Sequence, residues 1–308
     1  MRESVEAAAD RIRRLKIQGA RNVAIAAVKA IQEGAKASKA KRKETFLKEL
    51  SEAKELLFAS RATEPLMRNI IRHVIHAVET SEKEKVKELA DVISEDSKKF
   101  VENLEKSKKK IASVGAKRVY HDSKILTHCH SSTVSCMLRR AKEEGKSFEV
   151  VCTESRPVLQ GRITAKEMLE AGIKTTLIVD SAVRYFMNEV DLVVVGADAL
   201  TSEGNVINKI GTSIIALAAK EARTPFYVVS ELLKFDPATV SGDYEKIEER
   251  SAREVWDDPP HGLIIRNPAF DVTRRDFIHG IICEEGIVSP HTIGELVSRK
   301  YQWIFKVT

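Results

Sequence analysis

The distribution of glycine and proline divides this 308-residue chain into two parts that need different folds. Residues 1–112 contain two glycines and one proline, whereas residues 113–308 contain twelve glycines and seven prolines. Because glycine and proline interrupt helices, only the first part can be helical almost throughout. We therefore predict a helical N-terminal domain over residues 1–112 and a second domain over residues 113–308.

The first part has the pattern of helices that are buried along one face. Apolar residues recur at spacings of three and four within residues 23–31 and 66–77, as on the inner face of a helix. Residues 81–110 are rich in Lys and Glu and also carry an apolar stripe. This segment predicts a long helix that packs on one side and is solvated on the other.

The second part alternates short apolar runs with helix-length segments. The runs are rich in Val and Ile and apolar on both faces, as in parallel strands covered by helices on both sides. The expected strands are residues 124–127, 148–153, 175–179, 191–195 and 225–229, and the expected helices are residues 133–144, 164–171, 182–188 and 212–221. This alternation predicts a Rossmann-like α/β domain with a parallel sheet.

The charge of the chain is concentrated in its first part. The whole chain has 51 basic and 45 acidic side chains, a formal net charge of +6. Residues 1–112 hold 26 basic and 18 acidic side chains, and residues 113–308 hold 25 and 27. The surplus permits binding of nucleic acid or another anion. Because acidic residues are interleaved with the basic ones, a solvated helical surface explains most of it, and we do not expect a nucleic-acid partner.

Three features of the sequence bear on the cellular location of the protein. No run of about 18 apolar residues is present, so we expect no membrane span. The first residues lack the apolar segment of a secretory signal. Four cysteines in a chain of this length do not form the pattern of a disulfide scaffold. Together these features predict a cytoplasmic protein.

Polar residues follow each predicted strand, at the edge of the sheet where ligands of α/β proteins bind. Cys129 follows the first strand, between His128 and His130. A metal site is one explanation, although adjacent strand residues point to opposite sides and no second ligand cluster has a usable spacing. A packed free thiol is another. The third is a reactive thiol whose pKa is lowered by a helix N-terminus near Ser131.

Other strand ends suit acid–base chemistry on a phosphate ester. Asp198 follows the most apolar strand, where a carboxyl group can stay neutral and donate a proton, or can cap a turn. Asn208 and Lys209 precede a predicted helix whose first N–H groups could bind phosphate. Arg156 adds a guanidinium suited to an anion or to a structural carboxylate. Neither a GxGxxG nor a Walker-type nucleotide motif is present.

Seven segments together resemble one protein superfamily. They are THCHSS (127–132), TESRPVLQGR (153–162), VDSA (179–182), VVVGADAL (193–200), NVINKIGT (205–212), PFYVVSELLKF (225–235) and NPAFDVT (267–273). The superfamily contains regulatory subunits of translation initiation factor 2B, methylthioribose-1-phosphate isomerases and archaeal ribose-1,5-bisphosphate isomerases. Its isomerases use a cysteine and an aspartate that match Cys129 and Asp198, whereas the alpha subunit of the factor typically lacks that cysteine.

The resemblance implies conversion of α-D-ribose 1,5-bisphosphate to D-ribulose 1,5-bisphosphate, in nucleoside monophosphate (AMP) salvage, with no metal and no organic cofactor. It implies that Cys129 removes the proton from C2 and that Asp198 protonates the ring oxygen. The implied substrate-binding residues are Gln18, Gly19, Ala20, Arg21, Arg61, Asn208, Lys209 and Lys234, and the implied supporting residues are His128, Ser131 and Arg156.

The first loop departs from the family pattern, because it reads Gln-Gly-Ala-Arg where the archaeal isomerases often read Arg-Gly-Ala-Gly. The resemblance also implies a homo-oligomer, either a dimer formed through the α/β domain or a hexamer built from such dimers, and regulation by AMP. Two alternatives stay open at this point. One is a non-catalytic translation-factor subunit, which the basic helical part favours, and the other is a methylthioribose-1-phosphate isomerase.

Overall fold

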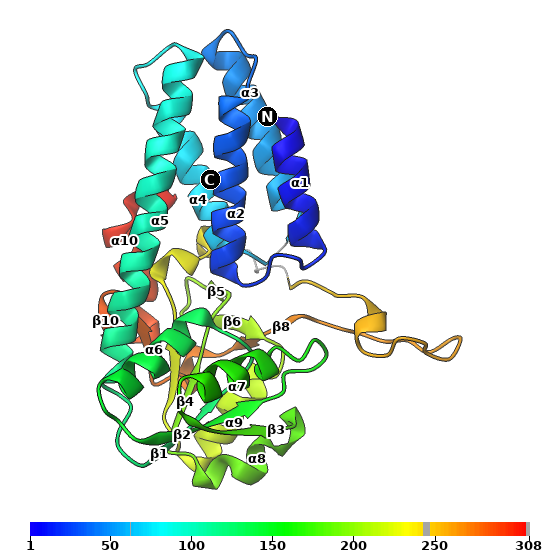
Figure 1. The fold of residues 1–308 in the computed structure, drawn as a ribbon, viewed down its shortest axis with the longest axis vertical. Coiled ribbons are helices and arrows are strands. Elements are labelled where there is room, and N and C mark those ends of the chain that lie inside the picture. Colours follow the sequence, from blue (N-terminus) through cyan, green and yellow to red (C-terminus); the bar gives the residue numbers. More distant parts are fainter. Residues whose placement is uncertain (62, 243–246, 306–308) are drawn as a thin grey trace.

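A computed structural model describes residues 1–61, 63–242 and 247–305. The N-terminal part is a helical bundle (Figure 1). Its helices are α1 (Arg2–Arg13), α2 (Ala20–Lys36), α3 (Lys43–Phe58), α4 (Pro65–Glu79) and α5 (Val86–Ala116). The two apolar stripes expected from the sequence lie on α2 and α4, and both are buried inside the bundle. The structure thus confirms a helical N-terminal region.

Helix α5 joins the bundle to the rest of the molecule. It continues past residue 112 to Ala116, and its last turns pack against α6 (Ser132–Glu143). There Ile111 and Ala116 are fully buried in a cluster shared with the α/β part. The boundary at residue 112 therefore falls inside a continuous helix, and the division into two domains there stays a prediction. No helix within the described ranges is long and apolar enough to cross a membrane.

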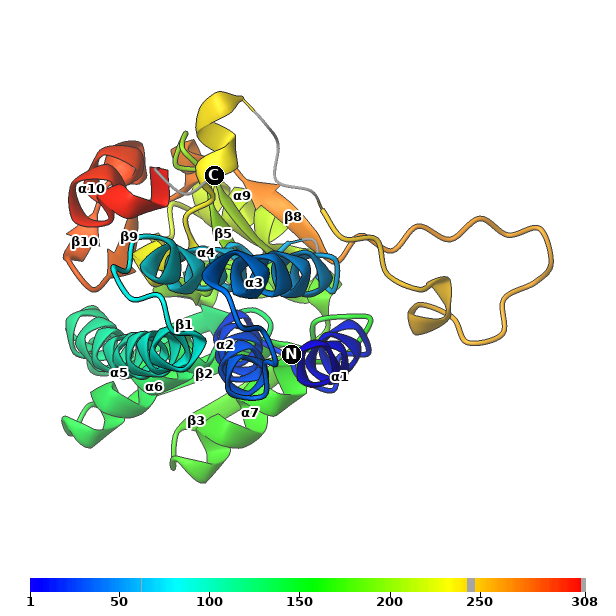
Figure 2. The same ribbon diagram turned by 90° about the horizontal axis from the view of Figure 1, so that it is seen from above.

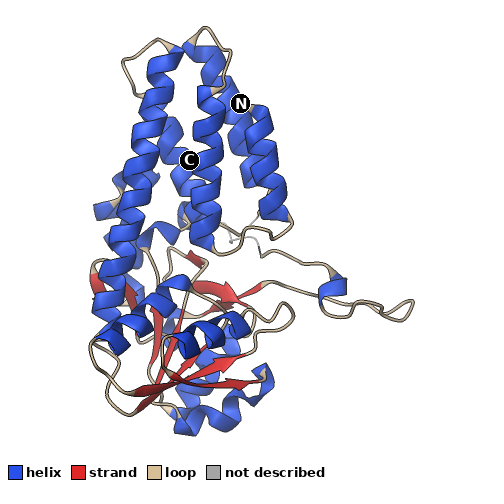
Figure 3. Ribbon diagram, in the orientation of Figure 1, coloured by secondary structure: helices blue, strands red, loops and turns tan. Residues whose placement is uncertain are grey.

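The main sheet has the strand order β10–β9–β7–β4–β1–β2–β3 (Figure 3). Its strands are β1 (Ser123–Thr127), β2 (Phe148–Thr153), β3 (Lys174–Ile178), β4 (Leu192–Val195), β7 (Phe226–Val229), β9 (Gly280–Cys283) and β10 (Gly286–Val288). Neighbouring strands are parallel except for the β9–β10 pair. All residues of the central strand β4 are buried, as its apolar sequence predicts. The five predicted strands are confirmed, and the structure adds β9 and β10.

Helices cover both faces of this sheet (Figure 2). Helices α5, α6 and α7 (Gly161–Glu170) lie on one face, and α9 (Thr212–Ala222) lies on the other. The short helix α8 (Val183–Phe186) packs against α9. The single helix predicted over residues 182–188 is wrong in detail, because α8 has four residues and is flanked by 3₁₀ turns. The predicted fold class, a helical N-terminal region followed by an α/β region with a mostly parallel sheet, is confirmed.

A second, smaller sheet lies between the main sheet and the bundle (Figure 1). It consists of the antiparallel strands β5 (Ala199–Leu200), β6 (Val206–Lys209) and β8 (Phe270–Thr273). The side-chain amide of Asn69 on α4 donates to the carbonyls of Leu233 and Phe235, at 2.9 and 2.8 Å, and ties the bundle to the α/β part. Between residue 247 and β8, the chain forms an arm that extends away from the rest of the molecule and returns to it (Figures 1 and 2).

Candidate active site

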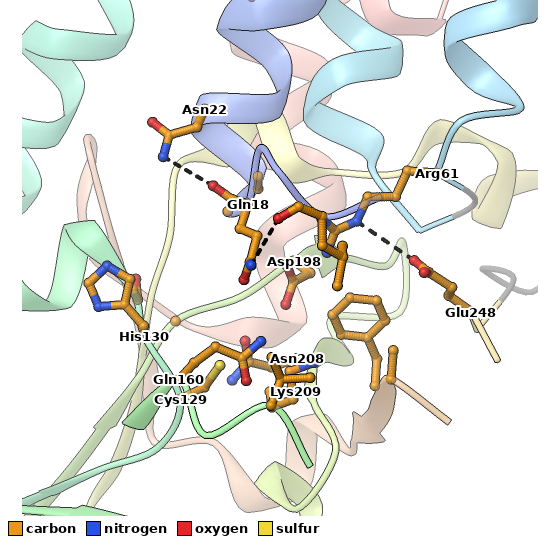
Figure 4. Close-up of a pocket in the computed structure, with 18 of the residues that line it drawn as sticks. Gln18, Asn22, Arg61, Cys129, His130, Gln160, Asp198, Asn208, Lys209 and Glu248 are labelled. Atoms are coloured by element: carbon orange, nitrogen blue, oxygen red, sulfur yellow. Dashed lines mark hydrogen bonds and ion pairs between the residues drawn. The ribbon is translucent and has the colours of Figure 1, made fainter. Parts of the chain in front are cut away.

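A cavity of about 410 Å³ lies between the lower end of the bundle and the carboxyl ends of β1 and β4 (Figure 4). Its size is within the usual range for small-molecule sites. The predicted site residues that line it are Gln18, Gly19, Ala20, Arg21, Arg61, Cys129, Ser131, Asp198, Asn208, Lys209 and Lys234. They come from the bundle, from the main sheet and from the small sheet, so the cavity exists only where these three parts meet.

Cys129 lies in the turn between β1 and α6. Its backbone is left-handed, with φ of 65°. Ser131 caps α6, because its side chain accepts the N–H of Val134, so the helix begins where the sequence predicts. The expected lowering of the thiol pKa is nevertheless wrong. Burial raises the pKa of Cys129 to about 11, and the nearby Lys209 ammonium offsets only part of that rise.

Asp198 is the second predicted catalytic residue and follows β4. Its backbone N–H donates to the carbonyl of Ile207 at 2.8 Å, which fixes the residue against β6 of the small sheet. The side chain is partly exposed and points into the same cavity as Cys129 (Figure 4). The carboxylate of Asp198 also contributes to the raised pKa of Cys129. The charges of these two groups are therefore coupled.

Lys209 and Arg61 flank the aromatic ring of Phe270. Lys209 lies on β6, and Arg61 lies before α4. The Lys209 ammonium is 5.0 Å from the ring centroid, and the Arg61 guanidinium carbon is 5.8 Å from it. In the described part of the chain, no carboxylate lies within ion-pair distance of Lys209, and Nε and Nη1 of Arg61 are buried without a hydrogen bond. This end of the cavity thus holds two cations with unused hydrogen-bonding capacity.

Arg21 and Lys234 also line the cavity, but both have strong partners. Arg21 is 7% exposed and pairs with Glu231 at 3.4 Å and with Glu105, and it donates to the Leu104 carbonyl at 2.8 Å. Lys234 donates to the Ala197 carbonyl at 2.7 Å and lies 3.6 Å from Glu231. These contacts hold α2 and α5 against the sheet, so much of the charge of both cations is already neutralised.

A second buried glutamate, Glu64, lies beneath Arg61. It is fully buried, 3.5 Å from the Arg61 guanidinium, and neither carboxylate oxygen accepts a hydrogen bond. Burial raises the pKa of Glu64 to about 7, although the Arg61 charge opposes this, and the carboxylate of Asp198 raises it further. Near neutral pH, Glu64 therefore neutralises Arg61 only in part, and Glu248, 3.7 Å from the Arg61 guanidinium, is its second carboxylate neighbour.

Two of the predicted supporting residues do not line the cavity. The imidazole of His128 is buried behind it, within 2.6 Å of the Thr153 hydroxyl and 2.9 Å of the Ile210 carbonyl. The side chain of Arg156 is exposed and donates to the carbonyl of Val255 at 2.9 Å. Any contribution of these two residues would have to be indirect.

The start of α9 is not the phosphate site that the sequence suggests. The carboxylate of Asp271 accepts the N–H groups of Gly211 and Ser213, at 2.8 and 3.1 Å, and the Ser213 hydroxyl at 2.8 Å. It thus occupies the N–H groups that a phosphate would need. The start of α6, in contrast, opens onto the cavity, where Ser132 and Thr133 line the wall.

Sequence reasoning missed several residues of the cavity wall. The missed residues are Gln160, Glu248, Arg250, Glu254, Asn267 and Phe270. Most of them belong to the arm or to β8, and no strand or helix was predicted in this part of the sequence. His130, which Figure 4 labels near Cys129, was considered only as a possible metal ligand. The motif NPAFDVT did mark Asn267 and Phe270, but only as part of a resemblance. No group of three or more His, Cys, Asp or Glu among the described residues is arranged to hold a metal ion.

Comparisons with known proteins agree with this architecture. A sequence model of the initiation factor 2 subunit family matches residues 16–290. The ribose 1,5-bisphosphate isomerase of Archaeoglobus fulgidus is 45% identical over 291 residues, covering 94% of this chain and 90% of that protein. That of Methanocaldococcus jannaschii is 42% identical over 300 residues, covering 96% and 95%. The solved structure of translation initiation factor eIF-2B from Pyrococcus horikoshii OT3 has a TM-score of 0.82 at 31% identity, covering 94% of this chain and 98% of that chain.

Proposed function

The chain belongs to the initiation factor 2 subunit family, and within that family we propose that it is an isomerase that converts ribose 1,5-bisphosphate to ribulose 1,5-bisphosphate. The curated relatives that carry this activity in their names match nearly the whole chain. The observation that carries the proposal is that Cys129 and Asp198 line one cavity together with Lys209 and Arg61. An acid, a base and cations for phosphate are what an aldose–ketose isomerisation of a bisphosphate requires.

The proposed reaction moves protons and needs no cofactor. As the sugar ring opens, the bond between C1 and the ring oxygen breaks, and Asp198 gives the ring oxygen a proton. Cys129 takes the hydrogen of C2 as a proton, which leaves an enol phosphate between C1 and C2. The thiol then returns a proton to C1 and Asp198 accepts the proton of the C2 hydroxyl, which becomes the ketone. Both residues end in the state in which they began.

The raised pKa of Cys129 bears on how this reaction starts. In the substrate-free cavity, burial keeps the thiol protonated at neutral pH. The proposed reaction begins with Cys129 as a thiolate and Asp198 as a neutral carboxyl group. This pair carries one proton in total, as does a Cys129 thiol beside an Asp198 carboxylate. We propose that the proton is redistributed within the pair, which removes the Asp198 charge that raises the thiol pKa.

The two phosphate groups of the substrate need two anion sites. We assign one to the Lys209–Arg61 pair, because these cations have unused hydrogen-bonding capacity and Glu64 beneath them is partly neutral. We assign the other to the start of α6, where Ser132 and Thr133 line the cavity. Gln18 of the first loop lies across the cavity from α6 (Figure 4) and would contact the sugar between the two sites.

Two alternatives make different demands on the cavity. A non-catalytic translation-factor subunit has no use for a thiol and a carboxyl in one enclosed site, so Cys129 and Asp198 disfavour it. A methylthioribose-1-phosphate isomerase needs only one anion site and an apolar site for the methylthio group. The second candidate anion site at the start of α6, in the same cavity as the Lys209–Arg61 pair, favours the substrate with two phosphate groups.

Purified protein should be incubated with ribose 1,5-bisphosphate, methylthioribose 1-phosphate and ribose 5-phosphate, and ketose formation should be followed. We expect turnover of the bisphosphate, and loss of at least about 100-fold in kcat for Cys129→Ser and Asp198→Asn. No turnover of any of the three would refute the isomerase assignment. Turnover of methylthioribose 1-phosphate alone would refute the substrate, and unchanged kcat in both variants would refute the two roles.

Assembly and location are also proposals. We propose a homo-oligomer formed through the α/β part, with the number of subunits open to measurement by light scattering. We keep a cytoplasmic location as a prediction from the sequence.

A further inference from the structure

A chain of buried hydrogen bonds begins at the backbone of Cys129. The N–H of Cys129 donates to the hydroxyl oxygen of Ser155 at 2.7 Å. Because the hydroxyl accepts this proton, its own proton must go to another acceptor. The hydroxyl oxygen of Thr153 and Nδ1 of His128 both lie 3.3 Å away, and the carbonyl oxygen of Thr153 lies 3.5 Å away. Ser155 and Thr153 are both fully buried, so bulk water does not reach these hydroxyl groups.

The direction of the remaining bonds follows from His128. Its Nε2 lies 2.9 Å from the carbonyl oxygen of Ile210, which can only accept, so Nε2 carries the hydrogen. Burial and the Lys209 charge lower the pKa of His128, so the ring is neutral and Nδ1 is an acceptor. The hydroxyl of Thr153 donates to Nδ1 at 2.6 Å. Because Thr153 is the closer donor to Nδ1, its hydroxyl oxygen is left to accept from Ser155, so Ser155, Thr153 and His128 form one hydrogen-bonded cluster.

This chain joins the two sides of the cavity that the proposed reaction uses. One end is the backbone of Cys129 after β1, and the other end is Ile210, the residue that follows Lys209. Gly211 leaves room for the imidazole, because a Cβ at this position would lie 3.3 Å from the His128 ring. The chain thus connects the turn that carries the thiol to the end of β6, which carries the ammonium group.

The chain also stabilises two unusual backbone conformations. Cys129 and Ser155 have φ of 65° and 61°, in the left-handed region that residues other than glycine seldom adopt. The Ser155 turn is held by Asp180, whose carboxylate accepts the N–H groups of Ser155 and Arg156 at 2.8 and 2.7 Å. Thr164 donates its hydroxyl to the carbonyl of Cys129 at 2.8 Å. The N–H and the carbonyl of Cys129 are therefore both held by hydroxyl groups, one from Ser155 after β2 and one from Thr164 on α7.

We propose that Ser155 is a positioning residue, which holds Cys129 in its left-handed conformation so that the thiol faces the reacting carbon of the substrate. This inference rests on the proposed role of Cys129 in proton transfer. Ser155 itself does not line the cavity. It acts through the backbone of Cys129 and through the chain of Thr153 and His128.

Two substitutions separate the hydroxyl of Ser155 from its backbone conformation. Ser155→Gly removes the hydroxyl but adopts a positive φ readily, whereas Ser155→Ala removes the hydroxyl and keeps the strain. We expect kcat to fall about 10- to 100-fold in both, with KM changed by less than about threefold, because the phosphate sites are left intact. The melting temperature should be higher for the glycine variant than for the alanine variant. The matched control is Asp122→Gly, an exposed residue with φ of 60° just before β1, which should leave kcat unchanged.

A second measurement does not depend on turnover. Alkylation of Cys129 by iodoacetamide, followed by peptide mass spectrometry on substrate-free protein, reports how firmly the thiol is held. We expect both Ser155 variants to react several-fold faster than the unsubstituted protein and the Asp122→Gly control, because a released thiol is less buried.

The outcomes separate this proposal from the proposed function. An unchanged alkylation rate in both Ser155 variants overturns the positioning role, whether or not the protein isomerises any sugar. A loss of kcat that follows the melting temperature, or a change in KM alone, overturns it as well. Faster alkylation in a protein that lacks isomerase activity supports the positioning role and refutes the proposed function instead.

Discussion

Two buried glutamates lie beneath the same cavity, and they differ in charge. Burial alone would raise the pKa of Glu231, but Lys234 and Arg21 hold it below its ordinary value. Burial raises the pKa of Glu64 to about 7, because Arg61 only partly compensates. Glu231 is therefore ionised at neutral pH, whereas Glu64 is divided between its neutral and ionised forms.

This difference decides which cations are available to a ligand. Arg21 and Lys234 are neutralised by an ionised partner and serve mainly to hold the cavity together. Arg61 lies near two carboxylates, the partly neutral Glu64 and Glu248 at 3.7 Å, but its Nε and Nη1 make no hydrogen bond to either. Lys209 has no carboxylate partner among the described residues. A residue that lines a cavity is thus not necessarily one that binds the ligand. The following predictions test this contrast, beginning with the largest effect.

Replacing Arg21 should reduce stability strongly. Arg21→Met leaves Glu231 with Lys234 as its remaining cation in a site that is 1% exposed. Removing one partner of a buried ion pair costs about 3–5 kcal/mol, which urea unfolding would measure. The double variant Arg21→Met with Glu231→Gln removes the uncompensated charge and should recover part of this loss. A loss below about 1 kcal/mol for Arg21→Met would show that its role is not structural.

Glu64 should make stability depend on pH. Its pKa rises from an ordinary 4.5 to about 7 on folding, so the folded protein binds more protons between these values. The stabilisation is fully present below pH 4.5 and is lost as the pH rises through 7. At 1.36 kcal/mol per pKa unit, it amounts to roughly 3 kcal/mol.

The control for this pH dependence is Glu64→Gln, which keeps the shape of the side chain but does not titrate. The unsubstituted protein should lose roughly 2–3 kcal/mol more than the variant between pH 5 and pH 8, by urea unfolding at each pH. Parallel stability curves for the two proteins would mean that Glu64 is ionised throughout, and the contrast with Glu231 would fail.

Replacing Lys209 should reduce activity and leave stability nearly unchanged. We expect Lys209→Met to lower kcat/KM about 10- to 100-fold, the cost of one charge-assisted hydrogen bond, with stability within about 0.5 kcal/mol. Lys234→Met is the matched control, because Lys234 lines the same cavity but bonds to Ala197 and Glu231. It should lose stability as well. Equal losses of stability in the two variants would contradict the distinction.

The sequence predicted the centre of the cavity because both central residues end parallel strands. Strand ends meet at one edge of a sheet, so the positions of Cys129 and Asp198 follow from the alternation of apolar runs. The fold class follows from the same alternation. The fold and the placement of these two residues in one cavity thus follow from local patterns of apolar and polar residues.

What the sequence did not predict depends on contacts between distant segments. Asp271 occupies the start of α9 from 58 residues further along the chain. Burial raises the pKa of Cys129 against the effect of α6, and that burial comes from several segments at once. Arg21 was expected to bind substrate, but Glu105 and Glu231, which neutralise it, lie on α5 and after β7. Tertiary packing, which no local pattern records, decides each of these cases.

Proton transfer from C2 to C1 through Cys129 is the central claim, and isomerisation in deuterium oxide tests it most directly. Ribose 1,5-bisphosphate should be converted by the unsubstituted protein in deuterium oxide, and NMR should locate the hydrogen isotopes at C1 of the product. The account predicts deuterium at C1 in part or all of the product, because the thiol exchanges its proton with solvent, and neither product nor exchange in Cys129→Ser. Product formation by Cys129→Ser at the unsubstituted rate, with or without deuterium at C1, would contradict it.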